Sequence, residues 1–132
     1  MTRAVCKIAP MTRHDDERGL SGSVQAVVLL PLTIGILLSL LQWSLQYWAE
    51  STALAAAQQG VAVASAYDGR WADGEAAAAE VAGNGSLSGV RVSITRGART
   101  TTATVSGRAV VVIWPRQISK TVTAATERVT GS

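Results

Sequence analysis

The sequence is poor in the residues that build most catalytic and metal sites. It has one cysteine, one histidine and no phenylalanine. Because Cys6 stands alone, the chain can form no internal disulfide and no metal site from paired cysteines. The one histidine, His14, lies in a charged segment near the N-terminus, where such a side chain is ordinarily solvated. These shortages favour a role in assembly over a role in catalysis.

Catalytic sequence motifs are missing as well. The chain has no glycine-rich phosphate loop, no Ser/His/Asp set, no HExxH and no paired-cysteine site. Asp73 and Glu75 are close in sequence, but carboxylates in the first turn of a helix ordinarily serve the helix dipole. We therefore expect no enzymatic activity, no cofactor and no metal.

The dominant feature is an apolar run of 25 residues, Val24–Trp48, that carries no charged side chain. As a helix it is about 37 Å long, which exceeds the ~30 Å hydrocarbon core of a bilayer. A signal-peptide core is shorter, about 7–15 residues. Trp43, Tyr47 and Trp48 at its far end are typical interfacial anchors. The run predicts one transmembrane helix, with Pro31 as the point where it bends.

The basic residues around this run predict its orientation. Four Lys or Arg residues precede it, whereas the first one after it is Arg70. The positive-inside rule then places the N-terminus in the cytoplasm and the rest of the chain outside. We expect a cytoplasmic leader over 1–23, the span over 24–48, an extracytoplasmic domain over 49–128 and a tail over 129–132.

Small and amide residues recur along one face of this predicted helix. Their spacing of three and four residues continues past the end of the apolar run. Small residues let helices approach closely, and amide groups can hydrogen-bond across the contact. The pattern indicates either a seam for self-assembly or for docking another helix, or chance in an alanine-rich helix. The seam consists of Gly35, Ser39, Gln42, Gln46, Ala49, Ala53 and Gly60.

Charge is divided between the two halves of the remaining chain. Residues 49–86 carry five acids against one base, and residues 87–132 carry seven bases against one acid. This division favours complementarity within one fold or between subunits. The bases are dispersed and no aromatic residues alternate with them, so direct nucleic-acid binding is not expected.

The residues after the span predict a small α+β domain. Strong helix formers extend the first helix over 24–66, and Asp68-Gly69 breaks it. A second helix, capped by Asp73, is expected to reach Ala82 and to end at the glycines that follow.

Beyond this helix the apolar period changes to that of strands. Residues 90–95 alternate apolar and polar, which indicates a half-buried strand. We expect the next strand or strands over 101–105 and 108–114, with a bulge at Gly107 and a stop at Pro115. A last strand is expected over 118–126. Together the elements predict a small antiparallel sheet with the helix covering one face.

The combined features resemble a known family, the TadE-like minor pilins or pseudopilins of tight-adherence (type IVb, Flp-type) pilus systems. The resemblance covers most of residues 17–128 and is carried by short segments. They are Glu17-Arg18-Gly19, the run from Ser23 to Pro31, Gln42-Trp43, the alanine-rich stretch from Ala55 to Gly60, the segment from Thr104 to Ala109, and Glu127-Arg128.

The resemblance implies how such a chain is processed and with what it assembles. A prepilin peptidase would cut after Gly19, so that the mature chain begins at Leu20. The partners would be other pilin-like subunits, the assembly machinery and the bilayer. The function would be in pilus biogenesis, adhesion or DNA uptake. The family carries a Glu early in the span, which pairs with a neighbour's N-terminal amine. Gln25 stands there instead, one residue further from Gly19 than the family spacing, and cannot form that pair.

Two other functions remain open at this point. One is a single-pass anchor subunit of another envelope or secretion complex, which the missing Glu favours. The other is a secreted protein with an over-long signal peptide cut near Ala53-Leu54-Ala55.

Overall fold

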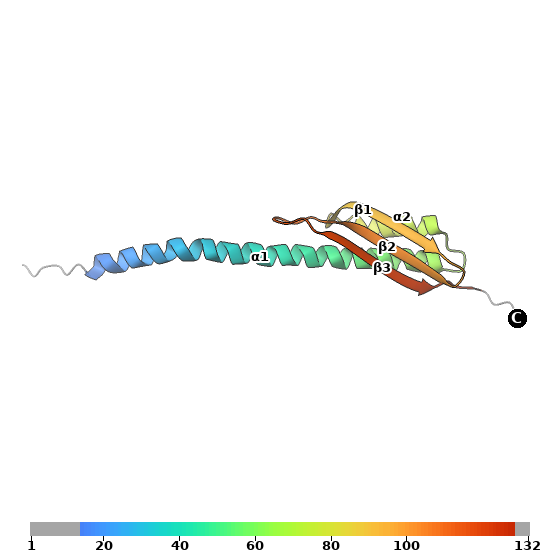
Figure 1. The fold of residues 1–132 in the computed structure, drawn as a ribbon, viewed down its shortest axis with the longest axis horizontal. Coiled ribbons are helices and arrows are strands. Elements are labelled where there is room, and N and C mark those ends of the chain that lie inside the picture. The colour runs from blue at the N-terminus through green and yellow to red at the C-terminus, as the bar shows by residue number, and fades with distance from the viewer. Residues whose placement is uncertain (1–13, 129–132) are drawn as a thin grey trace, which may run out of the picture. The chain divides into compact units, whose positions relative to one another are not determined.

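The computed structural model describes residues 14–128, with side chains described from residue 22 onward. It contains two helices followed by three strands (Figure 1). They are α1 (His14–Ser65), α2 (Trp71–Ala82), β1 (Leu87–Arg96), β2 (Thr100–Ala109) and β3 (Gln117–Ala125). The chain divides into two compact units, residues 1–37 and 38–132. The second unit holds the later part of α1 together with α2 and the sheet, so the predicted α+β class is confirmed.

Helix α1 is unbroken, as the sequence predicts, and continues through Pro31. It ends where the backbone turns at Gly69, whose N–H donates to the carbonyl oxygen of Ala66 at 2.9 Å. A side chain at Gly69 would collide with the carbonyl oxygens of Val63 and Ala64, so the turn needs glycine there.

No basic residue occupies the last turn of α1, but β1 supplies one. The guanidinium group of Arg96 donates to the carbonyl oxygens of Gly69, Ala66 (3.0 Å) and Tyr67 (3.5 Å). A cation at this position complements the negative end of the helix dipole and satisfies carbonyl groups that have no partner in the helix. Arg96 therefore joins the sheet to the end of α1.

The predicted start of α2 is wrong in one respect. The N-cap residue is Arg70, whose side chain makes no capping hydrogen bond, and Asp73 lies in the first turn. The helix begins three residues earlier than expected because Arg70 already has the extended backbone that precedes a helix, and Asp73 then acts through the dipole. The C-terminal end at Ala82, followed by Gly83, is as predicted.

The three strands form one antiparallel meander in the order β1-β2-β3. The predicted bulge at Gly107 is wrong, because Gly107 pairs in unbroken register with Ile118. The irregularity lies opposite, between Ser88 and Arg91, where Gly89 has a φ of 61°. Glycine adopts this left-handed conformation without strain, so the extra residue is accommodated there.

The predicted strand over 108–114 is also wrong, since β2 ends at Ala109 and residues 110–116 form a loop. Leu87, the first residue of β1, pairs with Ala109, and the Val110 N–H makes one more hydrogen bond, to the Ser86 carbonyl oxygen at 3.0 Å. Beyond it β1 offers no strand for a longer β2 to pair with. The loop is closed by a hydrogen bond from the Ala109 N–H to the Arg116 carbonyl oxygen, at 2.9 Å.

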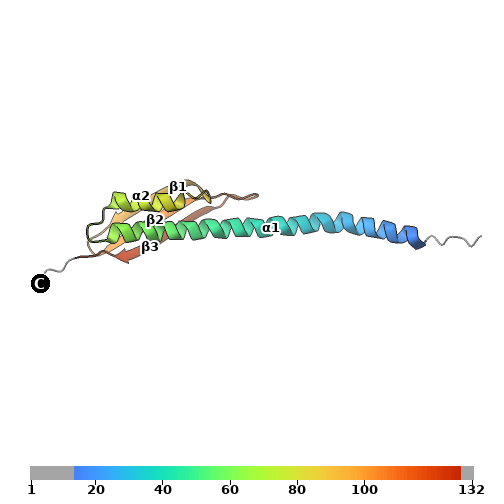
Figure 2. The same ribbon diagram turned by 180° about the vertical axis from the view of Figure 1, so that it is seen from behind.

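Both helices cover the same face of the sheet (Figures 1 and 2). Alternate residues of β2 are buried against them, from Thr101 to Ala109. On the other face, hydroxyl pairs link Thr102 to Thr123 (3.1 Å) and Thr104 to Thr121 (3.0 Å). The predicted covering of one sheet face by helix is confirmed.

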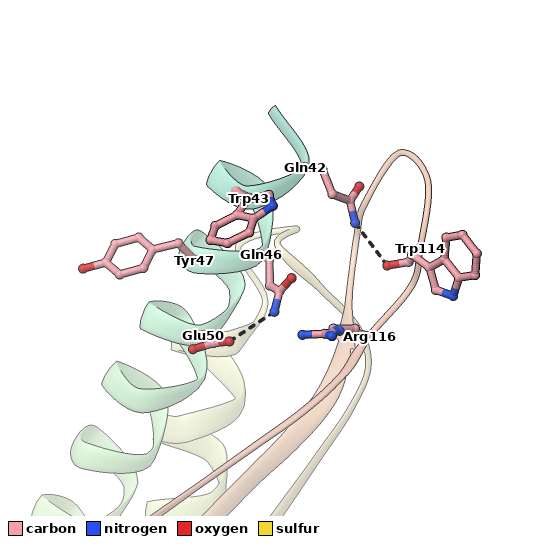
Figure 3. Close-up of a pocket in the computed structure, with 7 residues that line it drawn as sticks. All are labelled: Gln42, Trp43, Gln46, Tyr47, Glu50, Trp114 and Arg116. Carbon is pink, nitrogen blue, oxygen red and sulfur yellow. Dashed lines mark hydrogen bonds between the residues drawn. The ribbon is translucent and has the colours of Figure 1, made fainter. Parts of the chain in front are cut away.

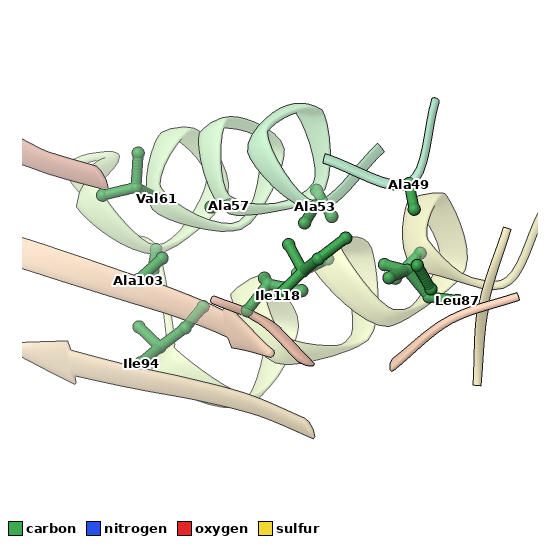
Figure 4. Close-up of a cluster of buried hydrophobic side chains, with 14 residues drawn as sticks. Ala49, Ala53, Ala57, Val61, Leu87, Ile94, Ala103 and Ile118 are labelled. Carbon is green, nitrogen blue, oxygen red and sulfur yellow. The ribbon is translucent and has the colours of Figure 1, made fainter. Parts of the chain in front are cut away.

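The core is built mostly from small side chains (Figure 4). Its largest fully buried side chains are Val105 and Thr101. Such a core buries little area per residue, so packing depends on the close approach of backbones. An added Cβ at Gly60 of α1 would lie 2.9 Å from the Ala78 Cβ and 3.1 Å from the Gly74 carbonyl oxygen of α2.

Candidate functional site

Helix α1 has two chemically different parts. The side chains of residues 22–41 are exposed throughout, and most of the exposed large apolar residues of the described chain lie there. By length and composition the helix is apolar enough to cross a membrane, and its most apolar window is wholly unburied in the fold. From Ala49 onward one face of the same helix is buried in the domain core. An apolar surface of that extent calls for an apolar environment outside this chain.

The structure separates the residues of the predicted seam. Ala49 and Ala53 are fully buried in the core, and Gly60 packs against α2. This part of the seam is thus occupied by the chain's own elements. Gly35 and Ser39 lie in the exposed part of α1.

The two glutamines of the seam contact groups of their own domain (Figure 3). The Gln42 amide donates to the Trp114 carbonyl oxygen at 3.2 Å and accepts from the Ile113 N–H at 3.1 Å. Gln46 donates to the Glu50 carboxylate at 3.5 Å. Gln42 therefore fastens the β2–β3 loop to α1 through two backbone groups.

The loop and the helix enclose an open cavity of about 710 Å³. Figure 3 shows the indole of Trp114 pointing away from α1, and Trp43 and Tyr47 projecting from the helix. Aromatic rings therefore extend in several directions around this level of α1. The cavity is lined by Gln42, Trp43, Gln46, Tyr47, Glu50, Trp114 and Arg116.

The predicted interfacial anchors Trp43, Tyr47 and Trp48 are all exposed. Sequence reasoning missed that the β2–β3 loop adds four further exposed apolar residues, Val110, Val112, Ile113 and Trp114. The backbone groups of Ile113 and Trp114 are bound to Gln42 of α1. A signal for it was present. Six apolar residues in a row before Pro115, from Ala109 to Trp114, break the alternation of a half-buried strand.

One ion pair crosses between the acidic and basic parts of the sequence in the described structure. The Lys120 ammonium of β3 lies 3.4 Å from the Glu50 carboxylate of α1. Arg91, Arg108 and Arg116 are exposed, and among the described residues no carboxylate pairs with them. These three guanidinium groups remain available to an external anion.

The residues of the predicted processing site lie near the start of α1. Gly19 and Leu20 are in the helix, and Gln25 is exposed. Over the described part of the chain, no group of three or more His, Cys, Asp or Glu residues comes together as a metal site would require.

The arrangement is a pilin-like layout: a long N-terminal apolar helix packed against a small antiparallel three-stranded sheet. Searches among protein families, curated proteins and solved structures find no match to this chain.

Proposed function

We propose that this chain is a non-enzymatic, single-span membrane subunit of pilin type, a TadE-like pseudopilin. The observation that carries the proposal is the double role of α1. Its later part is buried in the domain core, while its earlier part exposes apolar side chains on every face. One helix thus packs in the domain core at its C-terminal part and exposes an apolar surface at its N-terminal part. Such a helix suits a subunit that resides in the lipid bilayer and can leave it to join a filament.

The proposed topology places the N-terminus in the cytoplasm and the sheet outside. It is supported by the four basic residues before the span and by the lack of any between Trp48 and Arg70. The partners would be pilin-like helices that pack on the exposed part of α1. Gly35 and Ser39 are small residues of that surface and would allow close approach of a second helix.

A permanent single-pass anchor in another envelope complex is the second candidate, and Gln25 favours it. A carboxylate inside the bilayer is costly without a partner, whereas a neutral amide costs less. A chain that never meets a neighbour's amine would therefore carry Gln more readily than Glu at this position.

A secreted domain cut near Ala53-Leu54-Ala55 fits the structure less well. Cleavage there would remove Ala49, which is fully buried, and would expose the sheet residues that pack against it. The exposed part of α1 would then have no role in the mature protein.

Mass spectrometry of the intact protein, from membranes and from sheared surface material, tests these functions. A mature chain that begins at Leu20 and occurs in both fractions would support the pseudopilin. A chain that begins at Met1 and occurs only in membranes would favour the anchor. Loss of the whole apolar run from the mature protein would contradict both.

A further inference from the structure

We propose that the β2–β3 loop, residues 110–116, is a second membrane contact. Its apolar tip would enter the boundary between headgroups and acyl chains of the same bilayer that α1 crosses. The inference rests on the proposed span but adds to it, because a span alone requires nothing of the sheet domain.

The position of the loop along α1 is the first observation. Two hydrogen bonds join it to the helix, and both are made by Gln42. A helix that enters the hydrocarbon core at Val24 rises about 27 Å by residue 42, against a core about 30 Å thick. The Gln42 contact therefore holds the loop at the level where the helix leaves the membrane.

The exposure of the loop is the second observation. Val112 is 57% exposed, Ile113 53% and Trp114 74%. These neighbouring side chains form an exposed apolar patch on the domain. Trp43 and Tyr47 of α1, which line the same cavity as Trp114, are exposed as well. Tryptophan and tyrosine favour the membrane interface, where the ring body is apolar and the polar group stays hydrated.

Charge at the same end of the sheet is the third observation. Arg116 closes the loop, and Arg108 lies at the adjoining end of β2. Both are exposed, and no carboxylate among the described residues pairs with them. Guanidinium groups beside an apolar tip match the phosphates of anionic lipids lying above the acyl chains.

The shape of the region favours a bilayer over a folded partner. Trp114 points away from α1, and Trp43 and Tyr47 project from the helix itself (Figure 3). A partner helix would need one groove with convergent apolar walls. Trp43 and Tyr47 share one face of α1 and border an open cavity with Trp114, yet all three side chains remain largely exposed. Such outward-directed rings suit a planar medium better than a fitted helix.

Single-tryptophan variants of the full chain test the inference in vesicles of phosphatidylcholine and phosphatidylglycerol. Three variants each keep one of Trp114, Trp43 or Trp71, with the other tryptophans changed to Phe. Lipids brominated on the acyl chain quench nearby indoles. Trp71 is the matched control, because it is exposed and follows the C-terminal end of α1, about 35 Å of helix beyond Gln42.

We expect brominated lipids to quench the fluorescence of Trp114 and Trp43 to a similar extent and to leave the fluorescence of Trp71 unchanged. Quenching of Trp43 without Trp114 would overturn the inference and leave the span intact. Loss of quenching at both would contradict the span itself. Shielding of Trp114 from acrylamide that grows with the protein-to-lipid ratio, without quenching by brominated lipid, would point to a second copy and also overturn the inference.

The role of Gln42 as the positioning residue is tested in the variant that keeps Trp114. Gln42→Ala removes both hydrogen bonds to the loop, whereas Gln46→Ala removes only a bond within α1. We expect the first change to reduce quenching of Trp114 and the second to leave it unchanged. Equal effects of both changes would contradict the positioning role.

Discussion

The close contact between α1 and α2 gives the sharpest prediction, through the change Gly74→Ala. The new Cβ would lie 2.7 Å from each of three atoms: the Ala64 Cβ, the Gly60 carbonyl oxygen and the Ile94 Cδ1. Ordinary contacts begin at 3.4 Å, so the helices would have to separate by about 0.7 Å. The Ile94 side chain can turn its Cδ1 aside, but the Ala64 Cβ and the Gly60 backbone oxygen cannot move without moving α1 itself.

The size of the effect follows from two opposed terms. Overpacking a core costs about 1–3 kcal/mol, and replacing Gly by Ala inside a helix returns about 1 kcal/mol. Three short contacts, one of them with a backbone oxygen, place the cost at the upper end. The expected net loss of stability is about 2 kcal/mol, which lowers the Tm of a domain of about 80 residues by roughly 8–16 °C.

The assay is thermal unfolding of the full chain in detergent micelles, followed by near-ultraviolet circular dichroism. Gly22→Ala is the matched control. It is also a Gly-to-Ala change inside an α-helix, but no atom lies within 4 Å of the added Cβ. Adding Ile94→Val to Gly74→Ala should restore less than half of the loss, since it relieves one contact of three. An unchanged or higher Tm for Gly74→Ala would refute the reasoning.

Four further predictions concern polar contacts and processing. Arg96→Gln should lower the free energy of unfolding by about 1–2 kcal/mol, because the carbonyl groups at the end of α1 lose their charged hydrogen-bond donor. Arg91→Gln on the same strand should change it little. Denaturant midpoints of both variants check this, and equal midpoints would contradict it. Asn84→Ala should cost about 1–3 kcal/mol, since its side chain bonds Thr52 at 3.0 Å and the buried Ser86 at 2.7 Å. A hydrogen-exchange measurement should find faster exchange at the start of β1 in this variant, and unchanged exchange would be evidence against the role. Lys120→Met should shift stability by less than about 1 kcal/mol, because its ion pair with α1 is exposed and screened; a larger loss that vanishes in high salt would contradict this. Gln25→Glu should increase recovery of the protein in sheared surface material, as measured by immunoblot, and unchanged recovery would argue against a role for the amide in retention.

The small-residue core connects these predictions to the proposed function. Because alanine and glycine fill the space between α1, α2 and the sheet, the domain holds the later part of α1 by close backbone approach. The side chains of residues 22–41 of the same helix are exposed, which is the surface that the proposed span would present to lipid or to another subunit. A change at Gly74 therefore tests the domain without touching the exposed apolar surface.

The sequence by itself determined the elements whose signals are local. The uncharged run Val24–Trp48 predicted a long apolar helix, because length and composition alone decide that property. The alternation over 90–95 predicted a strand, since a half-buried strand repeats every two residues. The sequence also predicted that helix would cover one face of the sheet, because a small sheet with one apolar face needs a cover.

Only the tertiary structure decided the features that depend on a distant partner. The bulge lies at Gly89 rather than Gly107, because strand register is fixed by pairing between strands and not by the position of a glycine. The apolar residues after Ala109 form a loop because no strand extends beside them and because Gln42, some seventy residues earlier, binds their backbone. The face of α1 that includes Ala49 and Ala53 packs inside its own domain, which its periodicity could not tell from a surface for another chain. Periodicity reports which residues share a face, whereas the partner of that face is decided by the rest of the fold.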